Sequence, residues 1–296
     1  MQIITDQVYE FSKDNKPCAT AKPGEVLQFN TQDCFSNRIP DENNTMADLD
    51  YTYGFANPAA GPVYIEGAEP GDVLVVDIYE VKVADEGTIA TDDHCGPLFE
   101  TTGYRTKKIP IKDGMATFNQ VSFPINPMIG VIGVAPEGEP VNCGTPGSHG
   151  GNMDNTAITT GATLYFPVAV DGALFGCGDM HAAMGDGEVS VSGAEVAGYA
   201  TVTLTAMPEL KLVNPLIEND THFGIIVSAE SLDAAAELAV QQMVDLLASR
   251  TNESEADLVM LLSLVADVQV CQMVDPQKTV RFMVPKYVLD AIGFAL

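Results

Sequence analysis

The chain has 296 residues, 46% of them hydrophobic and 19% charged, a composition that indicates a folded globular protein and excludes the disordered and low-complexity classes. Its 41 acidic and 14 basic residues give a formal net charge of -27, so phosphate backbones and anionic membranes would be repelled. We therefore expect an acidic protein that binds neither nucleic acid nor membranes.

Six cysteines are scattered along the chain without a CxxC pair, which argues against a zinc ribbon or a thioredoxin-like site. Reduced thiols are the simplest interpretation, and residues 1–15 lack the basic and apolar regions of a secretion signal. The most apolar C-terminal stretch, 258–274, is interrupted by polar residues and is too short to span a bilayer. The sequence therefore predicts a soluble, cytoplasmic protein.

Up to about residue 225, short β-branched runs separated by Gly, Pro, Asn and Asp predict strands. Examples lie at 25–29, 73–83 and 131–134. The clearest hairpin signal joins 162–170 to 173–177, because Asp171-Gly172 suits the positive φ angles of a two-residue turn. A second strand pair is predicted at 189–191 and 199–205.

After about residue 228 the apolar period changes from two to 3.6. Ser231 can cap a helix over 231–249, and Ser254 begins a capping box for a second helix over 254–266. Alternation then predicts a strand at 280–284. We expect a mainly β fold, with a sandwich or jelly-roll-like body over 1–225 and an α+β C-terminal portion over 226–296.

Residues that can bind ligands gather in two loops at the open end of the predicted 162–177 hairpin. The loops are GSHGGNMDN at 147–155 and GDMHAAMGDGE at 178–188. A hairpin places its two open ends side by side, so these loops should meet. The meeting would bring together His149, Asp154, Asp179, His181, Asp186 and Glu188.

Imidazole and carboxylate ligands together favour a borderline cation such as zinc, whereas calcium or magnesium prefers oxygen ligands only. Glycines such as Gly150 and Gly151 would let the backbone approach a small ligand and leave N–H groups free to hold an oxyanion. Asp33, after a predicted strand, could add a carboxylate to the cleft, although an Asp at a strand end is usually a turn former. The alternative for both loops is ordinary turn chemistry with hydrogen-bonded surface histidines.

Several other chemistries lack their motifs. The chain has no GxSxG elbow, Walker A loop, early GxGxxG or HExxH helix. A cysteine nucleophile stays open, because Cys177 and Cys95 each lie near a histidine, but Cys177 falls on an apolar strand where an inert buried thiol is expected. His222, in a strand-like run, is interpreted as structural.

Three segments, taken in order, resemble the acetamidase/formamidase family. They are GPVYIEGAEPGD at 61–72, HGGNMDN at 149–155 and the 178–188 loop, and the tail segments LSL at 262–264 and VDP at 274–276 extend the resemblance. The resemblance implies a mainly β, oligomeric hydrolase of small amides that uses a divalent metal. Met184 stands where the family resemblance leads us to expect a polar residue such as Gln. The polarity of one wall of the substrate pocket should therefore differ.

The residues and the resemblance together predict a hydrolase of short aliphatic amides. We expect metal ligands at His149, Asp179, His181 and Asp33, proton transfer by Glu188 or Asp154, amide positioning by Asn152, and substrate contacts at Gly150, Gly151 and Met184. Zinc is the expected metal and calcium the alternative, in a homodimer or a higher homo-oligomer. Two rival hypotheses are a non-catalytic β module that binds calcium through acidic Gly-rich loops and a structural or regulatory dimer.

Overall fold

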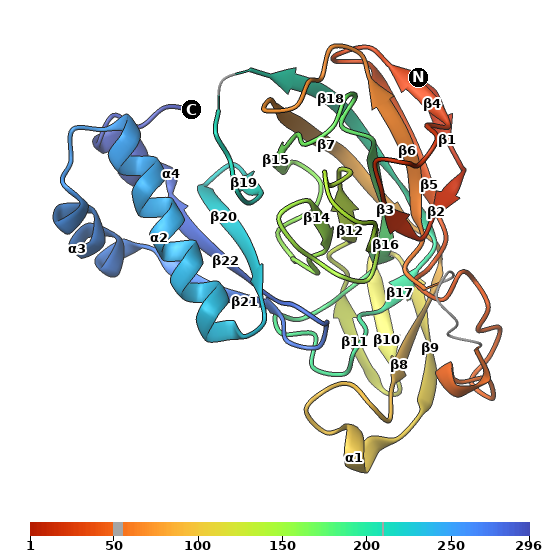
Figure 1. Ribbon diagram of the computed structural model, residues 1–296. Helices are drawn as coiled ribbons and strands as arrows, with labels where there is room; N and C mark the ends of the chain where they lie inside the picture. The colour runs from red at the N-terminus through yellow and green to blue at the C-terminus, as the bar shows by residue number, and fades with distance from the viewer. Residues whose placement is uncertain (50–55, 209) are drawn as a thin grey trace.

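The computed structural model describes residues 1–49, 56–208 and 210–296, and within these ranges strands are far more common than helices. One large sheet contains, in spatial order, β1 (Gln2–Ile4), β5 (Val26–Thr31), β18 (Gly198–Met207), β7 (Val73–Val83), β15 (Thr163–Pro167), β19 (Leu216–Glu218), β20 (His222–Ala229), β22 (Lys278–Pro285) and β21 (Asp267–Gln272). A mainly β architecture is therefore confirmed (Figure 1).

The second large sheet carries the strands that lead to the predicted site. Its order is β11 (Val121–Pro124), β10 (Met115–Phe118), β9 (Arg105–Lys112), β8 (Glu86–Thr91), β17 (Glu195–Val196), β16 (Phe175–His181), β12 (Met128–Gly133) and β14 (Gly150–Asn152). Beside it, β6 (Ala59–Ile65) pairs with β16, β2 (Gln7–Val8) and β4 (Ala19–Ala21), while β3 (Glu10–Phe11) pairs with β13 (Val141–Asn142).

A common apolar core joins the two large sheets. Phe29 of β5 contacts Phe175 of β16 edge to face, with ring centroids 5.3 Å apart, and both rings are fully buried. Leu74 and Phe166 from the first sheet and Ile129 from the second belong to the same buried cluster. Because side chains alternate along each strand, the opposite face of the first sheet presents other residues, such as Val73 and Tyr165, which belong to a second buried apolar cluster.

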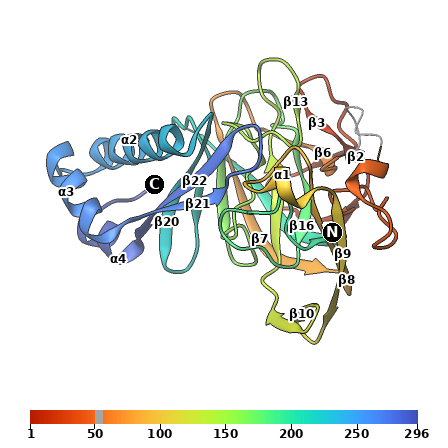
Figure 2. The same cartoon turned by 90° about the horizontal axis from the view of Figure 1, so that it is seen from below.

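The C-terminal helices form a layer on one end of the first sheet. These are α2 (Leu232–Arg250), α3 (Glu255–Val265) and α4 (Lys286–Ala291), and short helical turns occur earlier at η1 (Met46–Asp48) and α1 (Phe99–Thr102). Ser231 Oγ accepts a hydrogen bond from the Ala234 N–H and Ser254 Oγ from the Asp257 N–H, as the capping patterns predicted. Figures 1 and 2 show α2 lying across β20 and β22. No helix in the described ranges is both long and apolar enough to cross a bilayer.

The predicted hairpin over 162–177 is wrong. β15 pairs with β7 and β19 in the first sheet, whereas β16 pairs with β12, β17 and β6 in the second. The intervening segment crosses between sheets, with Ala173 and Leu174 at positive φ and the Gly172 N–H bonded to Ala68 O. An alternating pattern identifies a strand but does not select its partner.

The second predicted strand pair is also corrected, because 189–191 forms no strand. The other member, 199–205, lies within β18, between β5 and β7. The predicted 280–284 strand is confirmed inside β22. The predicted division after residue 225 falls within β20, a strand of a continuous sheet, and stays a prediction.

Candidate active site

β12 brings the two Gly-rich loops together, in place of the expected hairpin. Val131 of β12 lies opposite Asn152 of β14 on one side and opposite Gly178 of β16 on the other. The chain just after β14 and the end of β16 therefore run side by side. Asp154 follows β14, and Asp179 and His181 end β16, so the three side chains meet although the strand pairing behind the prediction was wrong.

His181 lies among carboxylates in the interior. Its Nε2 atom is 3.1 Å from Glu195 Oε2, 3.6 Å from Asp179 Oδ1 and 3.7 Å from Asp154 Oδ1. All four side chains are 2% exposed or less. Glu188 completes this group, since one ligand atom each of Asp154, His181 and Glu188 lie within 4.8 Å of one another. We call these five residues the carboxylate cluster.

Many polar atoms of the carboxylate cluster lack a partner. Among the described residues, no hydrogen-bond partner is found for Asp179 Oδ1, Glu188 Oε2, His181 Nδ1 or either Oδ atom of Asp154. A buried polar atom without a partner costs about 1–3 kcal/mol, and more when the group is charged. In native proteins such atoms commonly mark a bound water, a bound ion or a catalytic role.

Burial changes the acidity of the cluster. It raises the pKa of Glu195 to about 8 and that of Asp154 to about 6, although the charge on His181 lowers both. Burial also raises the pKa of Glu188 well above its ordinary value. Burial lowers the pKa of His181, but the charges of Glu195 and Asp179 raise it more, so the result is well above 6.5. A positive charge at this position is therefore strongly favoured.

Left-handed backbone conformations and close glycine contacts shape the cluster. Asp154, Asp179 and Glu188 have φ angles of 42°, 53° and 48°, in a region that non-glycine residues seldom adopt, and three such residues gather here. Gly130 forms one wall, because a Cβ atom there would lie 2.5 Å from Asp154 Oδ1. At Gly193 a Cβ atom would lie 2.5 Å from His181 Nδ1. Side chains at either glycine would displace the cluster.

The C-terminal strands contribute to the same place. Asp275, in the connection between β21 and β22, accepts a hydrogen bond of 3.0 Å from Asn152 Nδ2. Burial raises the pKa of Asp275 well above its ordinary value, and the charge of Asp154 raises it further. From the opposite direction, Asn57 Nδ2 donates to Asp179 Oδ2 over 3.1 Å. Residues from four distant parts of the sequence thus converge on one site.

A small polar cavity of about 160 Å³ opens beside the cluster. Its walls include Asn152, Asp179, Glu188, Glu195, Asp275 and Cys34. At roughly 30 Å³ per water molecule, this space suits a ligand of a few heavy atoms. Cys34, Asp179 and Glu195 also form a second group whose ligand atoms lie within 4.8 Å of one another. The structure therefore offers two neighbouring groups of residues that could hold a metal ion, with His181 of one group close to Asp179 and Glu195 of the other.

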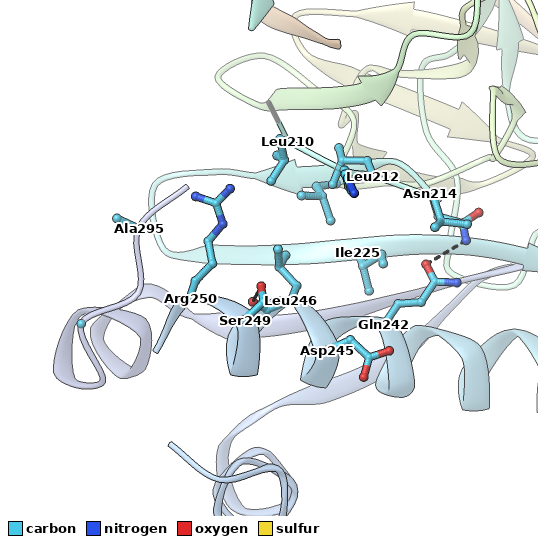
Figure 3. Close-up of a pocket in the computed structure, with 14 residues that line it drawn as sticks. Leu210, Leu212, Asn214, Ile225, Gln242, Asp245, Leu246, Ser249, Arg250 and Ala295 are labelled. Atoms are coloured by element: carbon cyan, nitrogen blue, oxygen red, sulfur yellow. Dashed lines mark hydrogen bonds between the residues drawn. The ribbon is translucent and has the colours of Figure 1, made fainter. Parts of the chain in front are cut away.

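Several larger hollows are lined by described residues, and one of them borders the cluster. A groove of about 640 Å³ with apolar walls such as Phe123 and Met184 also contacts Glu188 and Gly193. Figure 3 shows a cavity of about 770 Å³ between α2 and the segment 210–216, where Asn214 Nδ2 donates to Gln242 Oε1 over 3.0 Å. This second hollow belongs to the helical layer and contains none of the cluster residues.

The structure separates the predicted site residues into two sets. Asp154, Asp179, His181 and Glu188 lie in the cluster, and Asn152 lines the small cavity. Gly150, Gly151 and Met184 do not line that cavity, and Met184 faces the larger groove.

Two predicted metal ligands lie apart from the cluster. His149 and Asp33 belong to neither ligand group among the described residues. Asp33 Oδ1 accepts a hydrogen bond of 2.6 Å from the Asn37 N–H, so it forms the turn that was the alternative interpretation. His149 packs its ring edgewise against Phe11, with centroids 5.3 Å apart, and burial alone lowers its pKa to about 4.

Three site residues escaped the sequence reasoning. Glu195 lies in a strand of two residues within an unremarkable SGAEV segment, and Cys34 has no paired spacing, so neither carries a local signal. Asp275 did carry a sequence signal, because the VDP segment at 274–276 is part of the family resemblance. Cys177, weighed as a nucleophile, is fully buried on β16, and burial raises its thiol pKa, which opposes that role.

Comparison with known proteins agrees with this architecture. The model of the Acetamidase/Formamidase family matches residues 8–142 and 141–291. The chain belongs to this family. The resemblance inferred from the three sequence motifs is thereby confirmed.

Solved structures of family members are closely similar. A predicted acetamidase/formamidase from Thermoanaerobacter tengcongensis is 44% identical, with a TM-score of 0.96 over 100% of this chain and 99% of that one. An acetamidase from Bacillus halodurans is 41% identical, with a TM-score of 0.96 over 99% of this chain and 100% of that one. The formamidase of Methylophilus methylotrophus is 28% identical over 62% of this chain and 60% of its own length. The chain thus spans about three fifths of that relative.

Proposed function

We propose that this protein is an amidase that hydrolyses short aliphatic amides to ammonia and a carboxylate with the help of a divalent metal. The observation that carries the proposal is the carboxylate cluster: one imidazole among four buried carboxyl groups with unpartnered oxygen atoms, beside a cavity of about 160 Å³. Family membership supports the reaction class, and the small cavity supports short substrates.

The donor atoms fit a divalent cation. His181 Nε2, Asp179 Oδ1 and Asp154 Oδ1 lie near one another, and both carboxylate atoms lack a hydrogen bond among the described residues. A divalent cation at these residues, when bound, would polarise the amide carbonyl and make a water molecule more acidic. A mixed nitrogen and oxygen donor set favours zinc, whereas the preponderance of carboxylate oxygen favours calcium. His149 and Asp33 are left out of the proposed ligand set.

Two side chains on the cavity wall have the chemistry that the substrate needs. Asn152 donates its amide N–H to Asp275, which leaves Asn152 Oδ1 unpartnered and able to accept an N–H from the substrate amide. Glu188 lines the cavity and Asp154 does not, so we assign the proton transfer to Glu188. Burial raises the pKa of the Glu188 carboxyl, which favours the protonated form that a proton donor to the leaving ammonia needs.

Ammonia release from formamide and acetamide tests the proposal, with the purified protein assayed before chelation, after chelation, and after zinc or calcium is returned separately. We expect activity that disappears with the metal and returns with one of the two ions. A protein that binds calcium but releases no ammonia from either amide would support the non-catalytic β module instead. Full activity after metal analysis finds none retained would remove the metal from the mechanism.

Oligomeric state and location are further parts of this proposal. A homodimer or higher homo-oligomer is expected from the family resemblance, and a cytoplasmic location from the unpaired cysteines. Light scattering of the purified protein measures the first, and fractionation of the source cells measures the second.

A further inference from the structure

We propose that Arg281 is a positioning residue that fixes the two loops of the carboxylate cluster to each other and to strands β21 and β22. Arg281 lies in the middle of β22 and is 7% exposed. No motif pointed to it, and it does not line the small cavity. The measurement of metal affinity that tests this inference rests on the proposed function, whereas the measurement of loop protection by hydrogen exchange does not.

The guanidinium group bridges three segments of the chain. Nη1 donates to Asn155 Oδ1 over 2.9 Å and to Thr156 Oγ1 over 3.1 Å. Nη2 donates to Asp186 Oδ2 over 2.6 Å, and Nε donates to Gln269 Oε1 of β21 over 2.6 Å. Every nitrogen of the planar fork is therefore used, which a lysine ammonium cannot reproduce in the same geometry.

These contacts lie directly beside the cluster residues. Asn155 follows Asp154, and Asp186 precedes Glu188 by two positions. Thr156 Oγ1 also donates to Asp186 Oδ1 over 2.8 Å, so the two loops are bonded to each other as well as to Arg281. Asp154 and Glu188 both hold left-handed backbone conformations, which persist only where the surroundings constrain them. Arg281 supplies that constraint from the outer side of the cluster.

The backbone of the second loop has its own link to the same strands. The Gly187 N–H bonds to Cys271 O over 2.9 Å, and the Met273 N–H bonds to Gly187 O over 3.2 Å. The strand that carries Arg281 does not depend on the guanidinium, because β22 is paired along its length with β20 and β21. Its neighbours Val280 and Phe282 pack into the helical core on the opposite face. Loss of the guanidinium should therefore loosen the loops more than the sheet.

The test compares Arg281→Lys, Asp186→Asn and Thr156→Val with a matched control, Lys286→Met. Lys286 directly follows β22 and forms an ion pair of 3.5 Å with Glu218, away from the cluster. The first measurement is hydrogen exchange of full-length protein. In the first three variants, we expect faster exchange in both 153–157 and 185–188, with α2 unchanged. In the control, both loops should exchange as in the parent.

The second measurement is calorimetric titration with Zn²⁺ alone, below the melting transition. Changes to residues that orient metal ligands typically cost 10 to 100-fold in metal affinity, and we expect a loss of that size for Arg281→Lys and none for the control. A purely structural role would lower the melting temperature while the folded fraction kept its Zn²⁺ affinity and its loop protection. That result would overturn the proposal.

Two outcomes separate this inference from the proposed function. If the parent binds no Zn²⁺ and releases no ammonia, the proposed function fails, and hydrogen exchange alone decides whether Arg281 fixes the loops. If Arg281→Lys does not fold, Asp186→Asn and Thr156→Val carry the test. Asp186→Asn removes the charge of the ion pair with Arg281, and Thr156→Val removes the hydroxyl that contacts both Arg281 and Asp186. Unchanged exchange in both loops of these two variants would overturn the inference.

Discussion

Two histidines from neighbouring Gly-rich motifs occupy opposite surroundings. His181 lies within 3.7 Å of three carboxylates, whereas His149 packs against the Phe11 ring. Both are buried, yet the pKa of His181 is raised well above its ordinary value and that of His149 is lowered to about 4. Burial favours the neutral imidazole in both places, and only the carboxylates around His181 reverse the direction.

This difference shows why a motif alone does not identify a metal ligand. Both histidines lie in segments rich in glycine and acidic residues. Only His181, the last residue of β16, reaches the cluster. His149 directly precedes β14, in which Gly150 and Gly151 take positive φ angles. His149 therefore packs against Phe11, and we propose that His181 alone of the two serves the chemistry.

The largest expected effect is the loss of activity in His181→Ala. The substitution removes a proposed ligand, and loss of a direct ligand should cost at least the 10 to 100-fold that outer residues typically cost. Ammonia release from acetamide measures the loss, and a cooperative melting transition shows that the variant is folded.

His149→Gln is the matched control, because it changes a buried histidine outside the proposed ligand set. It should retain ammonia release and metal content close to those of the parent. If the two variants lose activity equally, the distinction between the two histidines is wrong and the original set with both as ligands is restored.

A second expected effect concerns acid stability. The pKa of His149 is lowered from 6.5 to about 4 because burial disfavours the charged ring, so the unfolded chain binds the extra proton first as the pH falls. Stability should therefore fall between pH 6.5 and 4, by about 3 kcal/mol at 1.36 kcal/mol per pKa unit. Urea unfolding at both pH values, with chelator present, compares the parent with His149→Gln. The loss of unfolding free energy between these pH values should be about 3 kcal/mol smaller in His149→Gln than in the parent. An equal loss in both proteins would mean that residues other than His149 cause the acid sensitivity.

Metal binding should stabilise the parent by a comparable amount. A ligand at 100 times its dissociation constant stabilises the folded state by about 2.7 kcal/mol if it does not bind the unfolded chain. Thermal melts with and without Zn²⁺ should show this gain in the parent and in His149→Gln, and little of it in His181→Ala. A gain that survives in His181→Ala would mean that the ion binds at other residues.

Local signals predicted much of the fold, and strand pairing escaped them. The caps at Ser231 and Ser254 are short-range interactions, so the starts of α2 and α3 were predicted closely. The 73–83 strand also matches β7, because its turn signal and β-branched run are adjacent in sequence. The partner of each strand depends on the two-sheet core, which is why the 162–177 hairpin failed.

The site followed the same division. Asp154, Asp179, His181 and Glu188 were predicted because they lie in two dense motifs that β12 joins. Glu195 stands outside both motifs and reaches His181 through the pairing of β17 with β16. Arg281 is 95 residues from the Asp186 that it contacts. Sequence spacing carries no information on such contacts.

The smallest expected effect concerns Met184, which shares a motif with His181 and was predicted to contact substrate. Met184 is half-buried and lines the groove of about 640 Å³ instead of the small cavity beside Asn152 and Glu188. Substitutions away from the cavity and the core usually change free energies by no more than about 0.5 kcal/mol, roughly a factor of two in rate. Met184→Gln should therefore leave kcat/KM for formamide and acetamide within about twofold of the parent. A tenfold change for either amide would show that the substrate extends into the groove. Met184 would then belong to the substrate site together with the cluster residues.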